Sequence, residues 1–170
     1  REAKLHTSWT DGSPAYEHAV QATVEQVLCS RAGLPLRRAL LRASNYIAAA
    51  GARNSLVQTT LRLTVPGVPD LYQGTEGWDL SLVDPDNRRP VDYVQRQQWL
   101  QQARDFSGLL RSWRDGAVKA RLTKLLLQLR REFPALFAKG DYQPLNVAVS
   151  GDAQVLAFRR QYRGQSLVVA

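Results

Sequence analysis

The sequence predicts an α/β protein that is mostly helical over residues 1–138 and rich in strands over residues 139–170. Three observations lead to this fold class. Residues 13–64 place apolar side chains at helical spacing, residues 68–72 form a short apolar run typical of a buried strand, and residues 141–170 contain strand-like runs separated by glycine turns. We therefore expect two domains, residues 1–138 and residues 139–170.

The first third of the chain is expected to form three helices. A Ser–Pro pair begins the first, over residues 13–30, because serine caps helix N-termini and proline suits the first helical position. Apolar spacing predicts two more helices over residues 36–50 and 53–64, with Gly51 as a break between them. Cys29 ends the apolar stripe of the first helix, so we expect a small buried side chain rather than a reactive thiol.

The middle of the chain combines a strand, a loop and two further helices. The sequence PGVP ends helix formation, so residues 68–72 are expected to form a short buried strand. Residues 73–90 show no periodicity and are expected to be a loop. Helical spacing returns over residues 91–113 and again over residues 117–133. In α/β folds the loop after the carboxyl end of a parallel strand forms the active-site face, so this loop is the expected site.

The last part of the chain carries three strand-like runs, DYQPLNVAV, AQVLAFRRQY and SLVVA. Tight hairpin turns are expected at Gly151–Asp152 and Gly164–Gln165. The final run stops inside an apolar strand, and an unpaired strand edge of this kind is unusual in a complete domain. The chain also starts with Arg1 and contains no methionine, so we expect a piece of a longer polypeptide.

Composition narrows the classes of function. The net charge is +8 and the pI is about 10.1, which alone would suggest an anionic partner. Lysines and arginines are spread as singles and pairs over several helical segments, so solvated helix faces are favoured and nucleic acid is not expected as a partner. No apolar run approaches the roughly 20 residues of a membrane span. A single cysteine and the lack of a signal peptide favour a cytoplasmic protein.

The loop and its flanks offer side chains that suit carbohydrate recognition. Carboxylates, guanidinium groups and amides bind sugar hydroxyls, and aromatic rings pack on the C–H face of a pyranose. The side chains concerned are Tyr72, Glu76, Trp78, Asp79, Asp84, Asp86, Asn87, Arg88, Arg89, Asp92 and Tyr93. A structural reading is equally open on composition, because Asp–Pro–Asp–Asn is a good turn sequence and the arginines can pair with neighbouring acids.

Other chemistry is not favoured. An EF-hand calcium loop is disfavoured because Arg88 stands where a ligand belongs. His6 and His18 are isolated, and no phosphate-binding glycine motif or nucleophile motif occurs. We therefore expect no metal site.

The string PGVPDLYQGTE resembles the strand-eight segment of the α-amylase superfamily (glycoside hydrolase family 13), whose members often carry a pattern close to PGxPxxYxGxE. The longer string PGVPDLYQGTEGWDLSLVDPDNRRPVDY is more specific and resembles the maltooligosyltrehalose synthase family. The flanks HTSWTDGSPAYEHAV, ARNSLVQTTLRLTVPG, RREFPALFAKGDYQPL and VLAFRR are similar to that family as well. Gly77 departs from the resemblance, which implies a bulky apolar residue beside Trp78.

The resemblance implies the C-terminal part of a (β/α)8 barrel, or TIM barrel, with insert helices, strand eight, its loop and closing helices, followed by the start of an antiparallel β domain. It implies an isomerase of trehalose biosynthesis. Such an enzyme converts the reducing-end α-1,4 linkage of maltooligosaccharides to an α,α-1,1 linkage by intramolecular transglycosylation, without a cofactor. It also implies a pathway partner, maltooligosyltrehalose trehalohydrolase.

The resemblance places the catalytic machinery elsewhere. The three catalytic carboxylates of the superfamily lie on strands four, five and seven, the last in an HDTKR-like segment that this chain lacks. They are expected upstream of Arg1, so no catalytic residue is expected here and the fragment alone is expected to be inactive. By loop position, the resemblance implies that the pocket around the terminal glucose is shaped by Tyr72, Glu76, Trp78, Asp86, Arg88 and Arg89.

Two alternative functions remain open. One is another hydrolase or glucosyltransferase of the same superfamily. The other is a non-catalytic basic helical module that binds nucleic acid or an acidic protein, which would account for the high pI but would leave the string at residues 65–93 unexplained.

Overall fold

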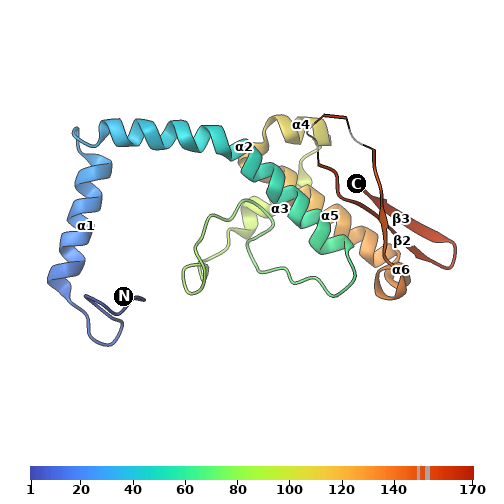
Figure 1. Ribbon diagram of the computed structural model, residues 1–170, viewed down its shortest axis with the longest axis horizontal. Coiled ribbons are helices and arrows are strands. Elements are labelled where there is room, and N and C mark those ends of the chain that lie inside the picture. Colours follow the sequence, from blue (N-terminus) through green and yellow to red (C-terminus); the bar gives the residue numbers. More distant parts are fainter. Residues whose placement is uncertain (149, 152–153) are drawn as a thin grey trace. The chain divides into compact units, whose positions relative to one another are not determined.

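The computed structural model describes residues 1–148, 150–151 and 154–170. The chain divides into two compact units, Arg1–Gly51 and Ala52–Ala170. Figure 1 shows the order of the elements, beginning with α1 (Pro14–Cys29) and α2 (Leu34–Thr64). The division falls inside α2, so this one helix contributes residues to both units.

The first unit consists of the N-terminal segment, α1 and the beginning of α2. The helix α1 begins at Pro14, as the Ser–Pro pair predicts. The predicted break at Gly51 is wrong, because α2 runs through it. Alanines stand on both sides of Gly51, and their high helix propensity offsets the cost of about 1 kcal/mol of a helical glycine. The prediction that Cys29 is buried is also wrong: Cys29 is exposed, and no residue of α1 is buried in the described chain.

The second unit has its main apolar core between α3 (Tyr93–Gln101), α4 (Phe106–Arg111) and α5 (Ala117–Glu132). The bounds of α5 confirm the helix predicted over residues 117–133. The core consists of Trp99, Leu109, Ala117, Val118 and Ala120, with Leu56, Trp78 and Trp113 packed against it. A 3-10 turn, η1 (Trp113–Asp115), leads into Gly116, whose φ of 84° lets the chain turn sharply into α5.

Two predictions for the middle of the chain are wrong. Residues 68–72 do not form a strand, and Val68 is 97% exposed. A strand needs a hydrogen-bonded neighbour, and the described residues place none beside this run. The helix predicted over residues 91–113 is split, because Asp105 Oδ1 accepts a hydrogen bond from Gly108 N at 2.7 Å and so caps a new helix. The predicted loop is confirmed, since residues 73–90 contain only turns, bends and irregular backbone.

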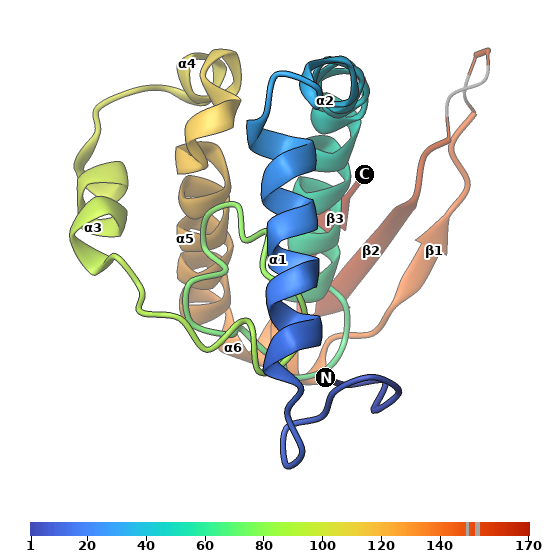
Figure 2. The ribbon, with the colours of Figure 1, turned by 90° about the vertical axis from the view of Figure 1, so that its left-hand side faces the viewer.

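A short helix, α6 (Pro134–Lys139), which the sequence did not predict, leads into a three-stranded antiparallel sheet. Its strands are β1 (Gln143–Leu145), β2 (Ala157–Tyr162) and β3 (Gln165–Val169), in the order β1–β2–β3, as Figure 2 shows. The sheet confirms that the end of the chain is β-rich. The predicted boundary between residues 138 and 139 falls at the end of α6 and stays a prediction, as does the barrel.

The β2–β3 turn differs by one residue from its predicted place. Tyr162 pairs with Gln165, so the turn residues are Arg163 and Gly164, with φ of 45° and 82°. Two positive φ values match the twist of an antiparallel hairpin. The other predicted turn, at Gly151–Asp152, lies partly outside the described residues. None of the helices in the described chain combines the length and the apolar character needed to cross a membrane.

Candidate functional site

Arg96 of α3 holds the beginning of the loop against that helix. Its Nε donates to Glu76 Oε2 at 2.9 Å, and its Nη2 donates to the carbonyl oxygen of Gly74 at 2.6 Å. Its Nη1 also donates to the carbonyl oxygen of Asp92, one turn earlier, at 3.0 Å. The Arg96 side chain is 17% exposed, so these charge-assisted hydrogen bonds lie largely away from water and fix the first turns of the loop.

Trp78 is anchored on the core side of the loop. Its Nε1 donates to the carbonyl oxygen of Trp113 at 2.6 Å, and the two indoles meet edge-on with ring centroids 6.3 Å apart. The preceding Gly77 lies directly against Trp99, where an added Cβ would come within 2.8 Å of two ring carbons. A bulky residue beside Trp78 has no room in this structure, because the Trp99 ring occupies the space.

Asp79, Ser81 and Arg89 form a hydrogen-bonded trio in the middle of the loop. Asp79 Oδ1 accepts from the Ser81 backbone N–H at 2.9 Å and from the Ser81 hydroxyl. Arg89 Nη2 donates to Ser81 Oγ and lies 3.4 Å from Asp79 Oδ1. The hydrogen bonds from Ser81, and then Arg89, lower the pKa of Asp79 against the effect of desolvation. Asp79 is therefore ionised at neutral pH, so it is better suited to accept hydrogen bonds than to act as a general acid.

The turn at residues 84–87, here called the outer turn of the loop, carries an exposed ion pair with the following Arg88. Arg88 donates from Nε to Asp84 Oδ1 at 3.0 Å and from Nη2 to Asp84 Oδ2 at 2.5 Å, and both side chains are more than half exposed. The hydrogen bond from Arg88 lowers the pKa of Asp84. This ion pair is the one expected if the arginines of the loop only pair with neighbouring acids. Exposed ion pairs of this kind contribute little to the stability of a protein. Asp86 is exposed on the same turn, and Tyr72 is 39% exposed just before the loop.

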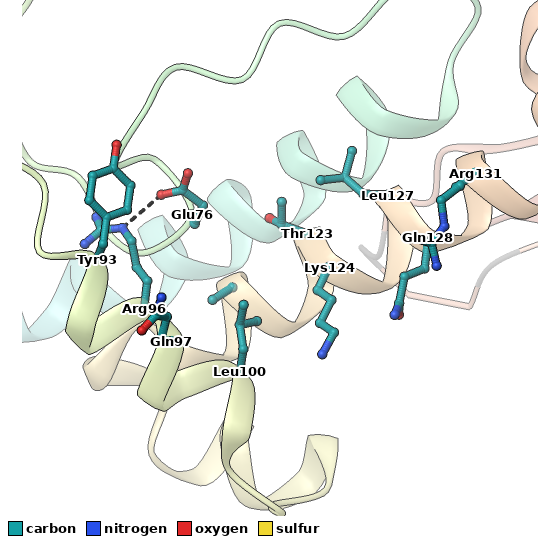
Figure 3. Close-up of a pocket in the computed structure, with 11 residues that line it drawn as sticks. Glu76, Tyr93, Arg96, Gln97, Leu100, Thr123, Lys124, Leu127, Gln128 and Arg131 are labelled. Carbon is teal, nitrogen blue, oxygen red and sulfur yellow. Dashed lines mark hydrogen bonds and ion pairs between the residues drawn. The ribbon is translucent and has the colours of Figure 1, made fainter.

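Among the described residues, side chains of the loop and its flanks line a loop hollow and an α3–α5 groove. The loop hollow has a volume of about 280 Å³ and is lined by Gln73, Gly74, Trp78, Asp79, Ser81, Asn87, Arg89, Pro90, Val91, Asp92 and Arg96. The α3–α5 groove, shown in Figure 3, has a volume of about 470 Å³ and is lined by Glu76, Tyr93, Arg96, Gln97, Leu100, Ala120, Thr123, Lys124, Leu127, Gln128 and Arg131.

The loop hollow is the better candidate for the functional site. It brings an indole, a carboxylate, a guanidinium group and an amide into one small space, and these are the groups that recognise sugars. The α3–α5 groove has aliphatic and basic side chains along α5, with the Glu76–Arg96 ion pair at one end (Figure 3). Of the six predicted residues, Trp78 and Arg89 line the loop hollow and Glu76 lines the groove. The other three line neither hollow: Tyr72, Asp86 and Arg88.

A buried cation lies beneath the loop. Lys119 of α5 is 8% exposed, and its Nζ lies 5.9 Å from the centroid of the Trp78 ring. Burial lowers the pKa of Lys119, the charge of Arg62 lowers it further, and Asp79 and Glu76 act in the opposite direction. Within the described residues, no three His, Cys, Asp or Glu side chains gather where they could hold a metal ion.

Comparison with known proteins identifies the relatives of this chain. No family model matches it. A Mycobacterium tuberculosis protein assigned as a maltooligosyl trehalose synthase is 39% identical over 170 residues, which is 100% of this chain and 20% of that protein. A crystal structure of maltooligosyl trehalose synthase is 34% identical, with a TM-score of 0.78 over 94% of this chain. The chain matches one segment of maltooligosyltrehalose synthases.

Further solved synthases agree with this match. The maltooligosyltrehalose synthase from Arthrobacter ramosus is 37% identical, with a TM-score of 0.72, and the match covers 93% of this chain and 20% of that one. The chain thus spans about one fifth of the length of the synthases it matches. All of these relatives are named as maltooligosyltrehalose synthases.

Sequence reasoning missed two side chains that organise the site, Arg96 and Lys119. Both stand on helices whose charged residues the sequence predicts to be solvated. A weak signal for Arg96 existed, because it stands four residues after Asp92 and so shares a helix face with the end of the loop. No such signal existed for Lys119, whose burial depends on Trp78 coming to lie over α5.

Proposed function

We propose that this chain is part of a maltooligosyltrehalose synthase. The whole enzyme would convert the reducing-end α-1,4 linkage of a maltooligosaccharide to an α,α-1,1 linkage. The observation that carries the proposal is similarity along the entire chain, at 39% identity over 170 residues, together with a TM-score of 0.78 to a solved synthase. The chain would belong to the C-terminal part of the enzyme: residues 1–138 to the catalytic barrel and residues 139–170 to a following β domain.

The proposed reaction is an intramolecular transglycosylation, which makes the enzyme an isomerase. A carboxylate would displace the last α-1,4 bond and form a glycosyl-enzyme intermediate, as in retaining glycosidases. The released glucose would stay in place, turn over and attack through its anomeric hydroxyl. The carboxylates for these steps would come from the rest of the enzyme, so we expect residues 1–170 alone to be inactive. The reaction of the whole enzyme would require no cofactor.

The loop would contribute to the pocket that retains the glucose. Water competes with the released glucose for the intermediate, so the pocket must hold glucose at high effective concentration and exclude solvent. The ring of Trp78, fixed through Nε1, and the pre-ordered trio of Asp79, Ser81 and Arg89 support this role. Glu76 would act through Arg96. Asp86 and Arg88 would approach the sugar from the outer turn, and Tyr72 would approach it from just before the loop.

The test uses the full-length enzyme and maltopentaose. Isomerisation removes reducing ends without shortening the chain, so we expect the reducing-sugar signal to fall while the mass of the pentasaccharide is unchanged. The product would be the substrate of a maltooligosyltrehalose trehalohydrolase, so adding that enzyme should release trehalose. Shorter reducing oligosaccharides as the main product would instead identify a hydrolase of the same superfamily.

A further inference from the structure

One side chain that lines the loop hollow has an amide oxygen without a hydrogen-bond partner in the described residues. Asn87 lines the hollow from the turn at residues 84–87, and its Oδ1 is enclosed without any hydrogen-bond donor. Buried polar atoms in proteins are nearly always hydrogen-bonded, so an unpaired one requires an explanation, and a ligand at the site is one of them. The oxygen and nitrogen of an amide can exchange places by rotation, so either a C=O or an NH2 group can stand at this enclosed position.

The other polar side chains of the hollow are already paired with protein groups. Asp79 and Arg89 share Ser81, Arg96 binds Glu76 and Gly74, and the Trp78 Nε1–H is donated to a backbone carbonyl. These groups shape the hollow and hold one another in place. Asn87 differs from these side chains, because its Oδ1 is enclosed and has no hydrogen-bond partner.

We propose that Asn87 is a specificity-determining residue that binds a hydroxyl group of the terminal glucose. The inference rests on the function proposed above and adds one named contact to it. A hydroxyl both donates and accepts, so it satisfies the amide in either orientation. An anion fits less well, because the Asp79 carboxylate lines the same hollow, and a wholly apolar group would leave the amide unpaired.

The experiment combines variants of the full-length enzyme with modified substrates. The substrates are maltopentaose and three analogues that lack the 2-, 3- or 6-hydroxyl of the reducing-end glucose. We expect Asn87→Ala to lower kcat/KM for maltopentaose about tenfold. For the one analogue that lacks the bound hydroxyl, the wild type should already be reduced to a similar degree, and Asn87→Ala should cause no further loss.

Two controls separate this role from a structural one. Asn87→Asp keeps an acceptor in the same place and should retain most of the activity. Val83→Ala alters an 84% exposed side chain of the same loop and should behave as the wild type. An Asn87→Ala enzyme with unchanged kcat/KM, or with the same loss on all four substrates, would overturn the inference. Failure of the wild-type enzyme to form a non-reducing product would instead overturn the proposed function.

Discussion

Arg160 Nη1 donates a hydrogen bond to the carbonyl oxygen of Thr64 at 3.1 Å, which joins β2 to the end of α2 across 96 residues of sequence. Arg160 is 1% exposed, and its charge is met by backbone carbonyl oxygens. Besides Thr64, its guanidinium donates to the carbonyl oxygens of Leu136, Phe137, Gly140 and Asp141. Because Thr64 ends α2 and Leu136, Phe137 and Gly140 lie at the end of α6, the cation also interacts favourably with two helix dipoles.

Arg160→Met should therefore destabilise the second unit strongly. The variant leaves several buried carbonyl oxygens without a donor, and each unsatisfied group costs about 1–3 kcal/mol, so we expect a loss of at least about 3 kcal/mol. Amide hydrogen exchange in the full-length enzyme measures this locally, at β2 and α6. The neighbouring Arg159→Met removes one hydrogen bond to Gln143 and should cost much less. Equal effects of the two substitutions would contradict the role given to Arg160.

Gly77→Ala should disturb the loop because of Trp99. The added Cβ would lie 2.8 Å from two carbons of the Trp99 ring, so the ring or the loop must move, at a cost of about 1–3 kcal/mol. Gly51→Ala is the matched control: that glycine lies inside α2 with nothing within 4 Å, and we expect it to stabilise the helix by about 0.5–1 kcal/mol. Hydrogen exchange should show opposite signs for the two variants, and a neutral Gly77→Ala would refute the packing described for the loop.

Part of the fold could be predicted because it depends on local sequence. The start of α1 and the extent of α5 follow from a Ser–Pro pair and from apolar spacing. The incorrectly predicted strand at residues 68–72 shows the limit of this reasoning, since an apolar run becomes a strand only beside a partner. The split between α3 and α4 depends on the capping carboxylate of Asp105, which competes with helical periodicity.

The candidate site was predictable in composition but not in geometry. The loop was recognised from its aromatic and charged residues, and two of the six predicted side chains, Trp78 and Arg89, do line one hollow. The contact between Arg96 and Glu76 spans 20 residues and depends on how the loop folds back on α3. Sequence spacing does not encode such a contact.

Trp78 should separate solvent exclusion from simple packing. If its ring covers the glucose, Trp78→Ala admits water, so free glucose should rise as a share of the products while synthesis falls. Trp78→Phe keeps an aromatic face but loses the hydrogen bond to Trp113, so we expect a stability loss of about 1 kcal/mol with an unchanged product ratio. An unchanged ratio in Trp78→Ala, with both products reduced together, would assign the ring to the core alone.

Lys119 should make stability depend on pH in the alkaline range. Burial lowers its pKa from an ordinary 10.5, so the unfolded chain binds this proton more tightly than the folded one. Between the folded and unfolded pKa values, the contribution of Lys119 to stability therefore increases as pH rises. Lys119→Met removes the buried charge, so its advantage over the wild type in unfolding by urea should shrink from pH 7 to pH 10. An advantage that grows with pH would contradict the lowered pKa.

The most direct test of the central claim is turnover of maltopentaose by the full-length enzyme in ¹⁸O-labelled water, followed by mass spectrometry after a short incubation. Intramolecular transglycosylation uses a hydroxyl of the substrate itself, so we predict a non-reducing product with the mass of unlabelled maltopentaose. Hydrolysis uses water as the acceptor. Free glucose together with shorter oligosaccharides that carry ¹⁸O at their new reducing end, as the main products, would contradict the account.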